Sequence, residues 1–194
     1  MNIGTMGRRL RTERSFLDIL NSDWPDWREA PRKEDRLKNR EWVRGFLARW
    51  GLDYAGVLDA EVVATLRDLR SLMRRIVQRL SRGADPSAED LSLLNQVLAA
   101  APSVHRLVRS GSQYQMEEAP LEKNWNWVRA EIARGLADMI AHGDPARFRI
   151  CENPECLWVF YDESRNRARR WCDERCGNLS RVRRFREKQR ATEG

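Results

Sequence analysis

Four cysteines between residues 151 and 176 constrain the fold of this 194-residue chain more than any other feature. Their spacing is C-x4-C-x15-C-x3-C, which makes two close pairs: Cys151 and Cys156, then Cys172 and Cys176. Cysteines with two to four residues between them can turn around one metal ion. Four thiolates complete the tetrahedral shell of Zn²⁺ and leave no position for water. The spacing therefore predicts a structural zinc site and not a catalytic one.

Two disulfides and a thioredoxin-like redox pair are the alternatives to zinc. Disulfides require an oxidising compartment, and residues 1–16 are arginine-rich without the apolar segment of a secretory signal. Neither cysteine pair has the C-x-x-C spacing of redox proteins. Reduced thiols without a signal sequence predict a cytoplasmic protein associated with the nucleoid, and no long apolar run suggests a membrane span.

The residues between and after the cysteine pairs predict a small zinc module. Residues 157–161 favour a strand, residues 162–166 a polar turn, and residues 169–171 a short returning strand. A helix is then expected to begin between Cys172 and Cys176, so that the last ligand lies in its first turn. This order of knuckle, hairpin and helix is typical of a treble-clef zinc finger.

The segment after Cys176 is densely basic and predicts a partner that carries phosphates. Leu179, Val182 and Phe185 recur every three residues and are expected to pack on the finger, while cations occupy most other positions. Arginine and lysine neutralise phosphates, and such a helix fits the major groove of DNA. A solvated basic tail is the alternative. The predicted nucleic-acid contacts are Arg167, Arg169 and Arg170 before the helix, and Arg181, Arg183, Arg184, Arg186, Lys188 and Arg190 within it.

The stretch from Cys151 to Asn178, which reads C-E-N-P-E-C-L-W-V-F-Y-D-E-S-R-N-R-A-R-R-W-C-D-E-R-C-G-N, resembles the CGNR zinc finger. That module occurs at the C-terminus of bacterial transcription regulators with an N-terminal ABATE domain, so the resemblance implies regulation through DNA. Two departures from the family pattern are present. Leu179 stands where the signature usually has arginine, and the second cysteine pair is one residue shorter than usual.

The N-terminal part carries a helical pattern. Apolar periodicity with capping residues predicts helices over residues 39–50, 59–80, 87–98 and 122–142, with a weak β-hairpin within residues 104–116. Residues 16–22 and 39–52 also resemble the ABATE domain. We therefore expect a mainly α chain with a regulatory or oligomerisation domain at 1–146 and a treble-clef-like zinc module at 147–194. The basic stretch at residues 32–40 is predicted to be a solvated loop.

Composition bears on partners and activity. A net charge of +7 favours a polyanion, and DNA is the predicted one; RNA binding or a zinc-stabilised protein adaptor are the alternatives. Eight tryptophans suggest either core packing or a pocket for a small effector that includes Trp42 and Trp125. A homodimer would match two DNA half-sites. With two histidines and all thiols assigned to metal, the sequence offers no recognisable acid–base pair and predicts no enzyme.

Overall fold

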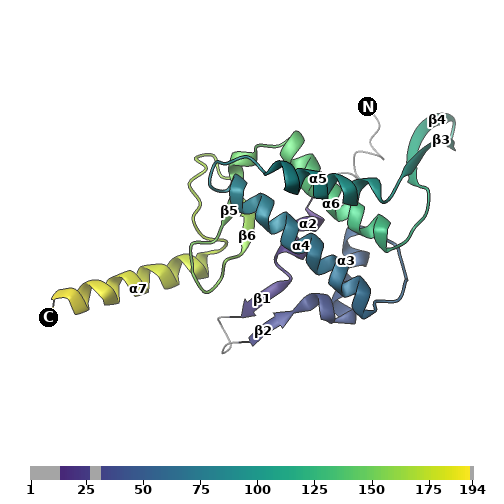
Figure 1. Cartoon of the computed structure of the whole chain (residues 1–194). Helices are drawn as coiled ribbons and strands as arrows, with labels where there is room; N and C mark the ends of the chain where they lie inside the picture. Colours follow the sequence, from purple (N-terminus) through teal and green to yellow (C-terminus); the bar gives the residue numbers. More distant parts are fainter. Residues whose placement is uncertain (1–13, 27–31, 193–194) are drawn as a thin grey trace.

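The computed structural model describes the backbone of residues 14–26 and 32–192 and, within these, the side chains of residues 14–23, 34–186, 189 and 190. The fold is mainly helical, as predicted (Figure 1). The α-helices of this part are α2 (Ser15–Leu20), α3 (Arg40–Trp50), α4 (Ala60–Leu80), α5 (Ala88–Ala99), α6 (Trp125–Ala141) and α7 (Glu174–Thr192). Two short 3-10 helices are η1 (Arg36–Lys38) and η2 (Pro145–Arg147).

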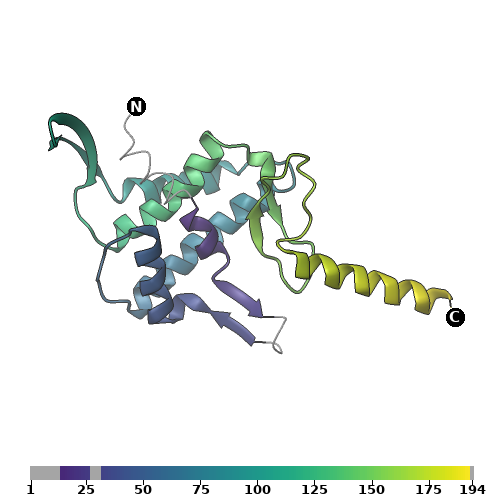
Figure 2. The same cartoon turned by 180° about the vertical axis from the view of Figure 1, so that it is seen from behind.

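The strands that the structure describes form antiparallel pairs of two. These pairs are β1 (Asp23–Asp26) with β2 (Arg32–Asp35), β3 (Ser103–Ser110) with β4 (Gln113–Pro120), and β5 (Phe148–Ile150) with β6 (Val159–Tyr161). The β3–β4 hairpin confirms the predicted one but is longer, and Gly111 in its turn has a left-handed φ of 63°. This hairpin projects from one end of the molecule, and α7 projects from the other (Figures 1 and 2).

Side-chain caps explain where the predicted helices begin. Asp59 accepts a hydrogen bond from the Val62 amide at 2.8 Å at the start of α4, and Ser87 accepts one from the Asp90 amide at 3.1 Å at the start of α5. The helix predicted from residue 122 begins at Trp125, because the cap is Asn124. The sequence therefore predicts the helices well and their first residues to within a turn.

Helix α4 lies at the centre of the hydrophobic core. It packs against α2, α5, α6 and β5. Its buried apolar residues are Leu66, Leu69, Leu72, Met73, Ile76, Val77 and Leu80. Phe148 of β5 and Val159 of β6 belong to the same core, and the Phe148 ring meets Phe16 edge to face at 6.1 Å. The β5–β6 hairpin is therefore packed directly on the helical part and lies between it and α7 (Figure 1).

The basic stretch at residues 32–40 is not the predicted loop. It forms β2, η1 and the start of α3, because Asp35 connects it to α4. The Asp35 carboxylate accepts hydrogen bonds from Arg67 at 2.6 Å and from the buried Arg70 at 2.8 Å, and it also caps η1 at Leu37. The local sequence shows the charge pattern here but not the distant arginines that order it.

We expect this ion-pair cluster to lose stability in acid. Burial alone would raise the pKa of Asp35, but hydrogen bonds from Arg70 and Arg67 outweigh it and lower the pKa from 3.8 to about 2. A carboxyl group with a depressed folded pKa stabilises the protein above its unfolded pKa, so this contribution is lost progressively as pH falls from about 4 to about 1. Asp35→Asn should cost about 1 kcal/mol at pH 6, a value reduced by solvent screening, and almost nothing at about pH 1. Urea unfolding at several pH values checks this, and a gap that stays constant with pH would contradict it.

Candidate metal centre and basic helix

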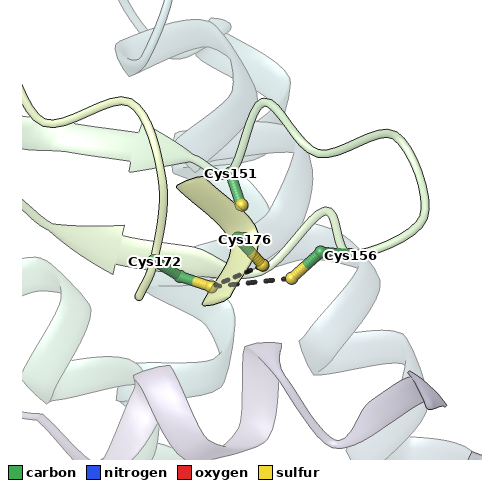
Figure 3. A group of neighbouring side chains, drawn as sticks. All are labelled: Cys151, Cys156, Cys172 and Cys176. Carbon is green, nitrogen blue, oxygen red and sulfur yellow. Dashed lines mark hydrogen bonds between the residues drawn. The ribbon is translucent and has the colours of Figure 1, made fainter. Parts of the chain in front are cut away.

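The four cysteine sulfurs lie together in one cluster (Figure 3). All four Sγ atoms lie within 4.8 Å of one another, and Cys172 Sγ is 3.6 Å from the Sγ atoms of both Cys156 and Cys176. Ligands at 2.3 Å on a tetrahedral zinc ion lie about 3.8 Å apart, whereas bonded disulfide sulfurs lie about 2.0 Å apart. The sulfur positions fit one tetrahedral ion, and all four cysteines are free of disulfides.

The chain reaches this cluster through two local structures. Cys151 follows β5 directly, and the Cys156 amide donates to the Asn153 carbonyl at 2.9 Å, which closes a tight turn before β6. Cys172 precedes α7, and Cys176 lies in its first turn, where its amide donates to the Asp173 side chain at 2.8 Å. The last thiol therefore lies at the start of the helix, as predicted.

The predicted returning strand at residues 169–171 is wrong. Strand β6 pairs with β5, which precedes Cys151, and residues 162–173 form no strand. Asp162 explains the difference. Its buried carboxylate accepts hydrogen bonds from the amides of Ser164 at 2.9 Å and Arg169 at 3.0 Å, which folds this segment into a loop. Burial raises the pKa of Asp162, but hydrogen bonds from the Ser164 side chain and from the amides of Ser164 and Arg169 lower it below its usual value.

The four thiol groups shift one another's pKa values: that of Cys151 is lowered, and those of Cys156, Cys172 and Cys176 are raised. Hydrogen bonds from the Cys156 and Cys172 thiols lower the pKa of Cys151, and the backbone amides of Cys172 and Asn153 add to this effect. The pKa of Cys172 is raised, because its thiol donates toward Cys151 and Cys156 and is partly buried. Four thiolates cannot share this space without a positive charge between them, and a divalent metal provides that charge.

Helix α7 does not pack on the finger through the predicted apolar stripe. Val182 is 45% exposed and Phe185 is 62% exposed. Arg183 makes the contact instead: its guanidinium lies 2.7 Å from the Glu155 carboxylate and 3.4 Å from the Asn153 side-chain oxygen. The start of α7 also lies against the finger, where Gly177 packs beside Trp171. The rest of the helix extends away from the body (Figures 1 and 2).

The structure divides the predicted nucleic-acid contacts into two groups. The paired group consists of Arg167, 2.9 Å from Asp144; Arg170, 2.7 Å from Glu152; Arg183; and Arg169, whose backbone binds Asp162 and whose guanidinium lies 5.0 Å from the Phe160 ring. The second group has no ion pair with any acidic side chain that the structure describes. It consists of Arg181, which donates to Asn178 at 3.0 Å, and the exposed Arg184, Arg186 and Arg190. The side chain of Lys188 lies outside the described residues.

Asn21 attaches the zinc module to the helical part, a role that the sequence does not reveal. Its buried side chain donates to the Val159 carbonyl at 2.9 Å and accepts from the Val159 amide at 2.8 Å. Arg74 of α4 adds hydrogen bonds to the carbonyls of Leu20 at 2.8 Å and Leu157 at 3.4 Å. The Asn21 side chain thus makes the two backbone hydrogen bonds to β6 that a neighbouring strand would otherwise make. Asn21 stands beside other polar residues, Asp18, Ser22 and Asp23, so its sequence neighbourhood does not single it out.

Trp42 and Trp125, predicted to line one pocket, both border a small enclosed gap in the core that has no room for a water molecule. Trp125 lines a cavity of about 640 Å³ beside α3. Trp42 is not part of that lining and instead stacks on Phe46 with 5.7 Å between ring centroids.

Fold and site together define a helical protein with a C-terminal four-cysteine zinc finger. A family model described as "ABATE: Putative stress-induced transcription regulator" matches residues 13–143, and a CGNR zinc finger model matches residues 147–189. The chain therefore belongs to the ABATE family and ends in a CGNR zinc finger, as its sequence resemblance indicates. The zinc-finger match and the sulfur cluster both support structural zinc as the cofactor.

No curated protein matches the chain. The two matched families are those of a regulator and a zinc finger, not those of enzymes. Among the described residues, no helix combines the length and the apolar character needed to cross a bilayer.

Proposed function

We propose that this protein regulates transcription by binding DNA through α7, which the four-cysteine zinc module holds away from the helical part. The division of the arginines carries this proposal. The arginines near the finger are committed to Glu152, Glu155 and Asp144, whereas Arg184 and Arg186 on the projecting helix face solvent. Unpaired guanidinium groups on a projecting helix are available to phosphates, whereas paired ones must first lose their partners.

The exposed apolar residues of α7 support insertion into a groove. Val182 and Phe185 remain exposed although arginines surround them along the helix. Apolar side chains contact the methyl group of thymine at the floor of the major groove, which also admits a whole α-helix. Cations on the flanks of α7 and an apolar stripe along it therefore favour binding to duplex DNA over the alternative role of a solvated tail.

The zinc module fixes the direction of this helix. Zinc supplies the cross-link between the Cys151–Cys156 turn and the start of α7 through its four thiolate ligands. Arg183 then joins the two sides a second time through Glu155 and Asn153. In this proposal Cys151, Cys156, Cys172 and Cys176 hold the metal, Arg183 positions the helix, and Arg184, Arg186 and Arg190 contact phosphates. Residues 1–146 serve as the regulatory domain.

Replacing Arg184 and Arg186 by glutamine should weaken DNA binding in a salt-dependent way. Each lost phosphate contact reduces the slope of log affinity against log salt by about 0.9, so the double variant should lose nearly two units of slope. At about 150 mM salt its affinity should fall roughly thirtyfold. Fluorescence anisotropy of a labelled duplex, titrated at four salt concentrations, measures both quantities.

Two matched variants make this test specific. Arg82→Gln removes an exposed arginine far from α7 in sequence and should leave the slope unchanged. Arg183→Gln removes a guanidinium already paired with Glu155, so the slope should change less than for Arg184→Gln. Equal slopes in wild type and double variant would exclude α7 as the contact. Tighter binding of structured RNA, or partner capture that survives nuclease, would favour the RNA-binding or adaptor alternative.

A further inference from the structure

A cavity of about 640 Å³ lies between α3 and the segment that leads to α4. Val43 and Leu47 of α3 form one wall, and Leu52 and Leu58 of the connecting segment form another. Val43, Leu47 and Leu52 also belong to the main hydrophobic core, so the inner side of the cavity is rigidly packed. The volume and the mainly apolar lining are typical of a site for a small organic ligand.

The outer wall of this cavity is held by specific contacts. The indole N–H of Trp125, at the start of α6, donates to the Val57 carbonyl at 2.8 Å. Tyr54 meets the Trp125 ring edge to face, with 5.4 Å between centroids. Val57 itself is 74% exposed, so burial of its own side chain does not explain why the chain takes this course. Trp125 therefore holds the connecting segment over the cavity.

The charged residues that line the cavity favour an anion. Arg40 and Arg44 stand one helical turn apart on α3, and both are exposed. Neither forms an ion pair with an acidic side chain in the described part of the chain. Asp53 is the acidic residue of the lining, so the local balance is one positive charge. A ligand with an apolar body and a single negative charge would satisfy both the walls and the arginines.

We propose that this cavity binds an amphipathic monocarboxylate, with its carboxylate at Arg40 and Arg44 and its apolar body between Leu47, Leu58 and Trp125. The ligand that binds here controls the regulatory domain. This signalling role rests on the proposed function, whereas the binding site does not. Binding itself is independent of DNA. Because the lining supplies few polar groups besides the charged ones, the site selects for charge and size more than for a precise hydrogen-bond pattern.

The test uses full-length, zinc-loaded protein and isothermal titration calorimetry. Octanoate and 3-phenylpropanoate are the probes, and their primary amides are the uncharged controls. Saturable binding at one site per chain is expected for the carboxylates, with binding at least tenfold weaker for the amides because the charged contact is lost. No saturable heat for either carboxylate up to about 1 mM would overturn the proposal.

Four variants locate the binding. Arg44→Gln should weaken octanoate binding about tenfold, and Ala48→Phe, which fills the cavity from an exposed position on α3, should abolish it. Arg82→Gln and Ala64→Phe are the matched changes at exposed positions outside the cavity lining and should bind as wild type does. Circular dichroism confirms that each variant is folded. Equal binding by Ala48→Phe and wild type would show that the ligand sits elsewhere and would overturn the proposal.

The signalling role has a separate readout. DNA affinity is measured with and without saturating octanoate, for wild type and for Ala48→Phe. A shift in wild type alone supports sensing through this cavity. Ligand binding without a shift leaves the site in place but refutes its role in regulation, whereas a failure to bind DNA at all refutes the proposed function and not the site.

Discussion

Removal of zinc, or replacement of Cys176 by serine, is expected to unfold the C-terminal module while the helical core remains folded. A four-cysteine zinc site contributes roughly 10 kcal/mol of folding free energy to a module of this size. Without the metal, the module keeps the hydrogen bonds of Asn21 and the burial of Phe148 and Val159, which involve only β5 and β6. The described side chains of residues 162–192 form no comparable apolar core of their own, so this segment should lose its order.

This expectation can be measured directly. Native mass spectrometry should find one zinc ion per chain in wild type and none in Cys176→Ser. Amide hydrogen exchange should accelerate strongly across residues 162–192 after chelation and change little in α4. Ser180→Ala, a change in the same helix that touches no thiol, should keep its zinc and its protection. Unchanged exchange in the module after complete metal loss would contradict the structural role of the ion.

The second large effect concerns Asn21. Asn21→Ala leaves the backbone amide and carbonyl of Val159 without their hydrogen-bond partner. In buried surroundings, each such unpaired group costs about 1–3 kcal/mol. We expect a loss of about 3 kcal/mol in the free energy of unfolding, because Val159 is buried and its amide and carbonyl both lose their partner. The Val159 amide should also exchange faster than in wild type.

Urea denaturation, followed by circular dichroism, measures the Asn21 effect. Asn95→Ala is the matched control, because Asn95 is exposed on α5, and it should change stability by less than about 0.5 kcal/mol. A similarly small change for Asn21→Ala would mean that the zinc module is not held by these hydrogen bonds. In that case the shared core around Phe148 would be the main attachment.

The features that the sequence predicts well are local ones. Cysteine spacing predicts the sulfur cluster because the two cysteines of each pair are separated by only three or four residues. Their thiols therefore stay close in space in most backbone conformations. Helices α3, α4 and α5 are predicted well because their caps, Asn39, Asp59 and Ser87, lie within three residues of the amides they bind.

The features that the sequence does not predict depend on distant partners. Strand β6 pairs with β5 because Phe148 is buried against Phe16, more than one hundred residues away. Asp35 finds Arg67 and Arg70 in the same way.

The apolar stripe of α7 shows a different limit of sequence reasoning. The repeat of Val182 and Phe185 correctly marks one face of a helix, but periodicity does not say what covers that face. Arg183, and not the stripe, turns toward the finger because Glu155 lies there.

In the proposed function, metal-bound thiolates hold an arginine-rich helix in position for DNA. Anisotropy of a labelled duplex tests it most directly, with the same protein sample measured zinc-loaded, after chelation, and after zinc is returned. Pre-organisation of the binding helix predicts that chelation weakens binding at least about tenfold and that zinc restores it. Equal affinity and equal salt slope in all three states would contradict the account.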